Sequence, residues 1–281
     1  MSKKYLLGVD GGTEGLRAGI FDVFGTPLAF ASTSYPTQFP APSWAEQDPN
    51  DWWYALGKSV RKAISDSGIS VDQIAAMAVD TTCCSVVPLD DSGNPVRPAL
   101  IWMDIRSAEQ AEQMVATEDD ALRINSNGSG PVSAEWMIPK ALWIKQNEPE
   151  NFDRAVTICE YQDYINLHLT GRLGASINNV STRWHCDYSR EGVPKSLLEK
   201  LDLGELAEKW PQDVFRLGEL VGGLTPRAAG HLGLTPDLPV VQGGPDAQIG
   251  MIGLGVVKPG NLALITGSSH LHLGLSEKPF H

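Results

Sequence analysis

The most constraining feature of this sequence is an apolar segment that ends on a carboxylate, turns on glycines and returns as a second apolar segment. It runs from Leu6 to Asp22, with Asp10 where the first segment stops and Gly11 and Gly12 in the turn. The pattern predicts a β-hairpin in which the glycines permit the positive φ values of a tight turn and let a ligand approach the backbone. Peptide N–H groups in such a turn can line an anion-binding concavity, and a carboxylate beside a phosphate suits Mg²⁺. The segment is therefore either an ordinary hairpin with an Asp-Gly turn or one wall of a phosphate site.

The composition excludes several classes of partner. A formal net charge of -12 argues against general nucleic-acid binding and against adhesion to an anionic membrane. No run approaches the ~20 apolar residues of a membrane span, and no signal-peptide core precedes the hairpin. The four cysteines include one adjacent pair, Cys83 and Cys84, and lack zinc-ligand spacing. We therefore expect a reducing, cytoplasmic setting and a small-molecule ligand, with no nucleic acid and no membrane as partners.

Further strands and helices alternate after the hairpin. Residues 28–35 read as a third strand, and Asp48 and Gly68 read as the N-cap and C-cap of a helix whose tryptophans pack in the core. Residues 74–79 read as a short buried strand. Three meandering strands followed by helices and further strands predict an α/β protein whose mixed sheet has an antiparallel edge.

A polar cluster in the middle of the chain suits a polyol. On an extended backbone, Trp102, Asp104 and Arg106 would share one face, where the charged groups bind hydroxyls and the ring covers a carbon face. The alternative is a structural Asp–Arg pair. Downstream, Ser133 reads as the N-cap of a helix that runs to about residue 146. Glu135 near that helix start is either functional or complements the helix dipole.

Two features near the end of the chain resemble the first. After a strand and a glycine turn, Asp246 begins a helix, where it is either a general base or a plain N-cap. Residues 262–275 repeat the pattern of apolar strand, small polar turn and apolar strand, which suggests an internal duplication. His270 and His272 would share one strand face, but the sequence offers no third metal ligand beside them.

Taken in order, these motifs resemble those of the FGGY carbohydrate kinases, and two of them are most similar to the ribulokinase-like (pentulose kinase) branch. The motifs are residues 8–13, 79–85, 102–106, 133–140, 242–247 and 266–269. The resemblance implies the actin-like ATPase (ribonuclease H-like) fold, an α/β architecture with a mixed sheet flanked by helices. It also implies an N-terminal sugar-binding kinase domain over 1–245 and the start of a truncated C-terminal nucleotide-binding domain over 246–281.

The implied activity is the phosphorylation of a terminal hydroxyl of a short sugar by ATP and Mg²⁺, with a ketopentose such as ribulose or xylulose as the expected substrate. Because family members are about twice as long, the chain resembles their N-terminal half. A homodimer or a complementing C-terminal half is then an expected partner. The alternative is a non-catalytic sugar-binding or regulatory fragment of the same fold. A third interpretation, an actin-type assembly protein, does not explain the polyol-facing residues.

The resemblance also assigns roles to individual residues. Asp246 is expected to be the catalytic base and Asp10 the Mg²⁺ ligand. One phosphate-binding wall is expected from Gly11, Gly12 and Thr13, and the opposite wall from Gly267, Ser268 and Ser269. The expected sugar-binding residues are Thr82, Cys83, Trp102, Asp104, Arg106, Glu135, Arg183 and Asp246.

Overall fold

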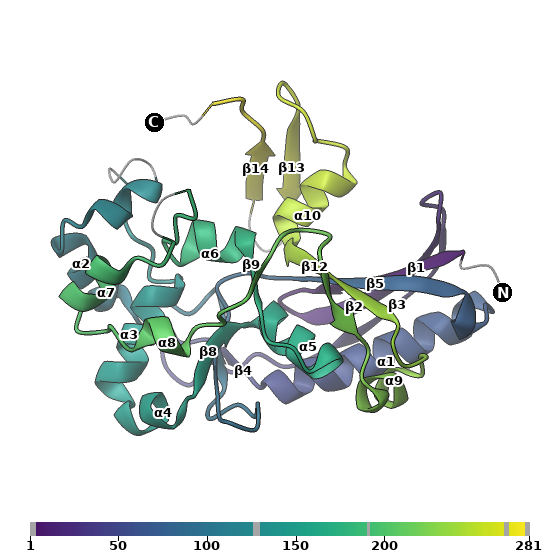
Figure 1. Ribbon diagram of the computed structural model, residues 1–281, viewed down its shortest axis with the longest axis horizontal. Helices are drawn as coiled ribbons and strands as arrows, with labels where there is room; N and C mark the ends of the chain where they lie inside the picture. Colours follow the sequence, from purple (N-terminus) through teal and green to yellow (C-terminus); the bar gives the residue numbers. More distant parts are fainter. Residues whose placement is uncertain (1–3, 126–129, 190–191, 267–269, 279–281) are drawn as a thin grey trace.

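A six-stranded mixed sheet forms the centre of the structure, a computed structural model that describes residues 4–125, 130–189, 192–266 and 270–278 (Figure 1). Its strand order is β11-β12-β5-β1-β2-β3. The first three strands form an antiparallel meander, whereas β5 and β12 run parallel to β1. The predicted mixed sheet with an antiparallel edge is therefore confirmed. Its strands are β1 (Tyr5–Gly11), β2 (Gly15–Asp22), β3 (Pro27–Ser34), β5 (Ile74–Thr81), β11 (Leu220–Gly223) and β12 (Pro239–Pro245).

Three helices cover one face of this sheet: α1 (Pro49–Ser67), α5 (Tyr161–Thr170) and α9 (Pro226–Leu232) (Figure 1). The predicted caps of the first helix are present. The Asp48 side chain accepts a hydrogen bond from the Asn50 N–H, and Gly68 adopts the left-handed conformation that ends the helix. Trp52 is fully buried and stacks on Tyr161, which joins α1 to α5 beneath the sheet.

A second apolar core lies beside the first, around a four-stranded sheet of order β4-β7-β6-β8. Its strands are β4 (Glu46–Gln47), β6 (Val86–Leu89), β7 (Ala99–Leu100) and β8 (Thr157–Glu160). The helices packed around it are α2 (Ala108–Ala116), α3 (Met137–Asn147), α4 (Pro149–Arg154), α6 (Ile177–Arg183), α7 (Lys195–Lys200) and α8 (Leu206–Lys209). The remaining short elements are η1 (Val71–Gln73), η2 (Asp120–Ile124), β9 (Ala175–Ser176) and β10 (Val214–Phe215).

The predicted start of α3 is wrong. Ser133 is not its N-cap, because a turn closed by the Trp136 N–H and the Ser133 carbonyl precedes the helix. The Ser133 hydroxyl instead accepts a bond from the Glu135 N–H at 3.2 Å. A local side-chain bond of this kind competes with the helical one and delays the helix start to Met137.

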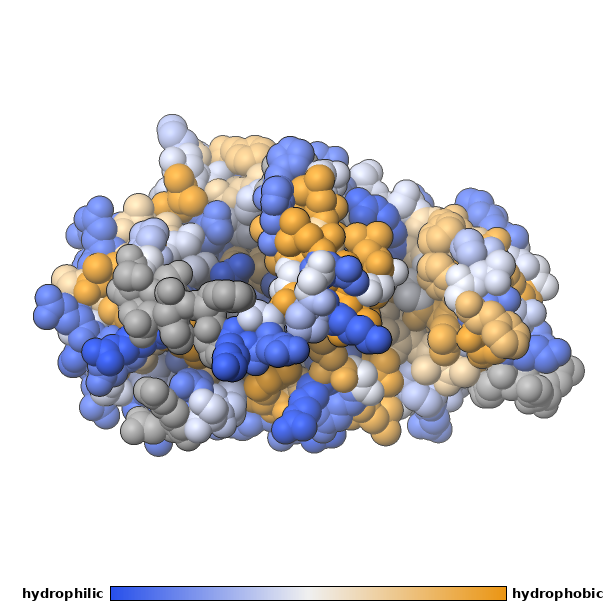
Figure 2. Space-filling model, turned by 90° about the horizontal axis from the view of Figure 1, so that it is seen from above, coloured by the Kyte–Doolittle hydropathy of each residue, from blue (hydrophilic) through white to orange (hydrophobic). Residues whose placement is uncertain are grey.

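The last part of the chain forms a small separate cluster. Helix α10 (Asp246–Gly253) packs on the hairpin of β13 (Leu262–Thr266) and β14 (His270–Gly274) through Met251, Val256 and Ala263. Leu254, Leu262 and Leu264 are each more than half exposed, and Figure 2 shows hydrophobic residues gathered over this part of the surface. Among the described residues, the helices lack the combination of length and hydrophobicity that a membrane crossing requires.

Candidate active site

Three carboxylates meet at one edge of the central sheet. Asp10 and Asp80 are paired across the parallel strands β1 and β5, and Asp246 begins α10 directly after β12. These strands are parallel neighbours, so their carboxyl ends lie at the same edge. Burial raises the pKa of Asp80 to about 8, and the negative charges of Asp10 and Asp246 contribute. Asp80 was not among the predicted site residues, although it lies at the end of a strand just as Asp10 does.

Asp246 is held at the start of α10. Its side chain accepts a hydrogen bond from the Ala247 N–H at 2.7 Å, which fixes the carboxylate at the start of α10. Burial is the main cause that raises the pKa of Asp246, and the charge of Asp10 adds to it, while the Ala247 bond and Arg17 act in the opposite direction. The group is therefore a stronger base than an exposed aspartate, because its protonated form is favoured.

Asp10 is reachable from solvent and is held by an arginine. Arg17 on the neighbouring strand donates to the Asp10 carboxylate at 2.5 Å, and the two side chains are 64% and 34% exposed. The described residues contain no group of three His, Cys, Asp or Glu side chains placed to hold a metal. Mg²⁺, however, is usually bound by one or two carboxylates together with water and phosphate oxygens. Asp10 fits that mode, because its side chain is partly exposed and can accept a cation that also binds water and phosphate oxygens.

The glycines of the opening segment do not have the backbone conformation expected of a tight turn, and their phosphate-binding role stays a prediction. Neither Gly11 nor Gly12 has a positive φ, so the prediction of that conformation is wrong. Gly11 is instead required by close approach, because a Cβ there would lie 2.8 Å from the Tyr161 hydroxyl. The Gly12 carbonyl accepts a bond from the Tyr35 hydroxyl, and its N–H donates to the Gly15 carbonyl at 3.1 Å. Packing against Tyr161 and Tyr35 therefore sets the backbone that follows Asp10.

Thr13 connects this turn to β4 and to the segment of Trp102. Its carbonyl accepts a bond from Gln47 at 2.8 Å, and its hydroxyl accepts one from the Trp102 indole N–H at 2.9 Å. The residue expected to face the phosphate and the aromatic residue expected to face the sugar are therefore in contact. The structure thus brings together two motifs that lie almost ninety residues apart in the sequence.

Asp104 and Arg106 are placed differently from the prediction that they bind sugar. Both side chains are completely buried, and they form an ion pair at 2.7 Å. Arg106 also pairs with Glu46 at 2.7 Å and lies 3.7 Å from the Trp44 ring centroid, while Asp104 accepts from the Ala45 N–H. These partners close both side chains off from solvent, although the Arg106 Nη1 atom has no hydrogen-bond partner. The structure therefore supports the alternative, a structural Asp–Arg pair that holds the segment of Trp102.

The remaining predicted sugar residues come from three segments that converge. The Thr82 N–H donates to the Gly11 carbonyl at 2.9 Å, so the segment containing Cys83 lies beside the opening turn. Arg183, at the end of α6, interacts with the Cys83 thiol and lies 5.6 Å from the Trp136 ring centroid. Glu135 occupies the turn before α3, next to that tryptophan.

A buried lysine holds two of these segments together. Lys140 on α3 donates to the Cys84 and Ile101 carbonyls, each at 2.7 Å, and its side chain is fully buried. Burial lowers its pKa to about 8. In the sequence, Lys140 is only the last residue of the motif 133–140, because nothing local shows that its ammonium group reaches two distant carbonyls.

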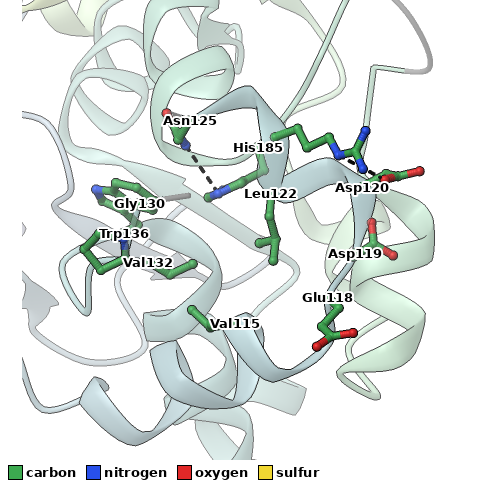
Figure 3. Close-up of a pocket in the computed structure, with 12 residues that line it drawn as sticks. Val115, Glu118, Asp119, Asp120, Leu122, Asn125, Gly130, Val132, Trp136 and His185 are labelled. Atoms are coloured by element: carbon green, nitrogen blue, oxygen red, sulfur yellow. Dashed lines mark hydrogen bonds and ion pairs between the residues drawn. The ribbon is translucent and has the colours of Figure 1, made fainter. Parts of the chain in front are cut away.

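A cavity of about 390 Å³ lies beside this region but does not contain the predicted site (Figure 3). Trp136, His185 and Asn125 are among its lining residues, and the Asn125 amide lies 3.3 Å from the His185 ring nitrogen. Burial, with a contribution from Arg183, lowers the pKa of His185 to about 4. No residue predicted to bind sugar or phosphate lines the cavity. The cavity and the sheet edge where the carboxylates meet are therefore separate regions of the structure.

The predicted second phosphate wall, Gly267, Ser268 and Ser269, lies outside the described residues. Its flanking strands are described: Thr266 pairs with His270 in an antiparallel hairpin that packs against α10. The predicted hairpin is therefore present, and the helix that begins with Asp246 contacts both of its strands. His270 and His272 belong to no described group of possible metal ligands.

Comparisons with known proteins show which family this chain resembles. The sequence profile of the FGGY family of carbohydrate kinases, N-terminal domain, matches residues 5–253. The chain is 31% identical over 310 residues to a ribulokinase of Geobacillus thermodenitrificans, covering 99% of this chain and 54% of the relative. It is 27% identical over 271 residues to a xylulose kinase of Escherichia coli, covering 96% and 54%.

The fold comparison gives the same result. The crystal structure of a xylulose kinase from Rhodospirillum rubrum aligns with a TM-score of 0.84 at 26% identity, covering 93% of this chain and 53% of that one. The predicted actin-like ATPase fold is therefore confirmed. The chain spans about half the length of the curated relatives it matches.

Proposed function

This chain belongs to the FGGY family of carbohydrate kinases, and we propose that it carries the sugar site and the catalytic base of an ATP-dependent kinase of a short sugar. The observation that carries the proposal is Asp246, fixed at the start of α10 and at the same sheet edge as Asp10 and Asp80. A ketopentose is the proposed substrate, because ribulokinases and xylulose kinases are among the relatives.

In the proposed reaction, the sugar lies between the end of β12 and the segment of Trp102. The terminal hydroxyl gives its proton to the Asp246 carboxylate as its oxygen attacks the γ-phosphorus of ATP. The bond from that phosphorus to the β,γ-bridging oxygen breaks in line, and ADP leaves. Mg²⁺ held near Asp10 would neutralise charge on the phosphates during this transfer.

The proposed binding residues come from the central sheet and from the segments around the second apolar core. Trp102 would cover a carbon face of the sugar, since its N–H is already bound to Thr13. Cys83, Glu135 and Arg183 offer polar groups near Trp136. The phosphate wall would include Thr13 and the turn that begins at Gly11. The predicted boundary between the kinase domain 1–245 and the segment 246–281 stays a proposal, supported by the separate apolar cluster around α10.

A substrate screen tests this function. The protein expressed from its complete reading frame is incubated with ATP, Mg²⁺ and each of a set of ketopentoses, tetruloses and polyols, and ADP release is followed with a coupled assay. We expect at least one ketopentose to give sugar-dependent ADP release that a metal chelator abolishes. Failure of every sugar to release ADP or to give a calorimetric binding signal would contradict the proposal.

A second candidate function is sugar binding without phosphoryl transfer. The family profile that matches residues 5–253 contains every described residue proposed to bind sugar, whereas the second predicted phosphate hairpin lies beyond it. Calorimetry separates the two functions. Sugar binding without ATP binding or turnover would favour this second candidate.

The pH dependence of turnover follows from the surroundings of Asp246. The base works only when ionised, so we expect kcat to fall as pH drops through the raised pKa of Asp246, at a midpoint above the ordinary value of about 3.9. Arg17 stabilises the ionised form, so Arg17→Gln should move this midpoint to higher pH. The measurement is kcat against pH at constant, saturating Mg²⁺. Arg172→Gln, which removes a surface arginine paired with Asp213, is the matched control and should leave the midpoint unchanged.

A further inference from the structure

Cys83 and Cys84 form an adjacent thiol pair beside the proposed sugar site. Their sulfur atoms lie 3.7 Å apart, and Cys83 is half-buried whereas Cys84 is buried. Cys159 and Cys186 are also buried, and each has a backbone carbonyl, not a second thiol, as its partner. Cys83 and Cys84 are therefore the two cysteines whose thiols lie close enough to react with each other.

The surroundings make the two thiols chemically different. A hydrogen bond with Cys84, assisted by the positive charge of Arg183, lowers the pKa of Cys83. The same bond, together with burial, raises the pKa of Cys84 well above its ordinary value. A thiolate is the reactive form of cysteine, and a neighbouring thiol can resolve its oxidation product. Cys83 therefore has the character of an attacking sulfur and Cys84 that of a resolving one.

Buried charged groups hold the backbone of this pair. Cys84 adopts a left-handed conformation with a φ of 63°, which is uncommon for a residue other than glycine. Its N–H donates to the Glu160 carboxylate at 2.9 Å, and its carbonyl accepts from Lys140 at 2.7 Å. A covalent change at Cys84 would thus disturb contacts that also support the segment of Trp102, because Lys140 binds the Ile101 carbonyl too.

We propose that Cys83 and Cys84 form a peroxide-reactive modification site, in which the pair closes reversibly to a disulfide. The Cys83 thiolate attacks one oxygen of a hydroperoxide, the O–O bond breaks, and the departing hydroxide is protonated to water when hydrogen peroxide is the oxidant. The Cys84 sulfur then attacks the sulfenic sulfur, the S–O bond breaks, and a second water leaves with the Cys84 proton. Two thiols are oxidised and one peroxide is reduced.

The closed form would be easily reduced. Adjacent Cα atoms across a trans peptide are about 3.8 Å apart, whereas disulfide-bonded residues usually have Cα atoms at about 4.4–6.8 Å. Strained disulfides have more oxidising potentials, so thiol reductants should reopen this one. Closure would also move Thr82 and Cys83 relative to Arg183 and Trp136. If the proposed function holds, the oxidised chain should bind sugar more weakly than the reduced chain.

Peptide mass spectrometry tests the site without reference to kinase activity. The full chain is reduced, desalted and treated with hydrogen peroxide, then blocked with an alkylating reagent and digested with trypsin. The peptide 63–106 contains both thiols and neither Cys159 nor Cys186. We expect this peptide to lose two hydrogens and escape alkylation, and dithiothreitol to reverse the change. Cys83→Ser and Cys84→Ser should each prevent it, whereas Cys186→Ser, the matched control, should not.

Rates give a second measurement that does not depend on cysteine variants folding. We expect Cys83 to react with hydrogen peroxide at least about tenfold faster than Cys159 or Cys186 in the native wild-type chain. Arg183→Gln should remove most of this difference in rate. Arg172→Gln should leave the rate unchanged. Equal rates for all cysteines, or a sulfinic acid at Cys83 without disulfide formation, would overturn the proposal.

Sugar binding is then measured by calorimetry on reduced and oxidised samples. If neither sample binds sugar, that result counts against the proposed function. The evidence for or against the disulfide is not affected by it. Equal sugar affinity of the two samples would overturn only the link between oxidation and the sugar site.

Discussion

Replacing Asp246 with asparagine is expected to lower kcat by about 100-fold or more while sugar affinity stays nearly unchanged. Asparagine keeps an oxygen that can accept the hydrogen bond from the Ala247 N–H, so the start of α10 should keep its conformation. It cannot take a proton from the sugar hydroxyl. The loss should therefore fall on the transition state and not on ground-state binding.

Steady-state kinetics and calorimetry on the same preparation measure this effect. Asp51→Asn is a matched control, because Asp51 also lies in the first turn of a helix, α1, which packs on the opposite side of the sheet from α10 (Figure 1). It should leave kcat within experimental error of the wild-type value. Near-normal turnover by Asp246→Asn would remove Asp246 from the role of base. A large loss of sugar affinity with unchanged kcat would make it a binding residue only.

Replacing Arg106 with methionine is expected to lower the free energy of unfolding by about 3–5 kcal/mol. The side chains of Arg106 and Asp104 are completely buried, so the variant leaves the Asp104 carboxylate buried without its cation. It also removes the bond to Glu46 and the contact with the Trp44 ring. Breaking one partner out of a buried pair costs far more than the pair itself contributes, because the remaining charge cannot reach water.

Urea denaturation without any ligand measures this loss. Arg172→Met is the matched control, because the Arg172–Asp213 pair is half exposed and should contribute only about 0–1 kcal/mol. A similar, small loss for both variants would show that the Arg106 pair is not desolvated. Because no sugar is present, a large loss for Arg106→Met separates the structural role that we assign from the sugar-binding role that the sequence suggested.

Local patterns were enough for much of the fold. The caps Asp48 and Gly68, the opening hairpin and the helix that begins at Asp246 were all predicted from neighbouring residues. Each depends on φ/ψ preferences, capping bonds or alternation within a few residues, which a sequence displays directly. The start of α3 was missed because the bond from the Glu135 N–H to the Ser133 hydroxyl competes with helix formation over the same short range.

The opening turn shows where such reasoning stops. The turn was predicted at Gly11 and Gly12, but Gly11 is the last residue of β1 and neither glycine has a positive φ. What requires a glycine at position 11 is the ring of Tyr161, which is 150 residues away in the sequence. A close approach of this kind has no local signal, because the same Asp-Gly-Gly segment would suit many turns.

From the sequence alone came the opening hairpin, several other strands, the caps of α1 and the motifs that place this chain among the sugar kinases, whereas β11 of the central sheet was not predicted. Only the tertiary structure brought Asp80 to the carboxylates, buried Asp104 with Arg106, and aimed Lys140 at the Cys84 and Ile101 carbonyls. The physical reason is that a charge acts according to its solvent exposure and its partners. Both are set by distant segments that pack together, so the same aspartate can be a base, a metal ligand or part of the core.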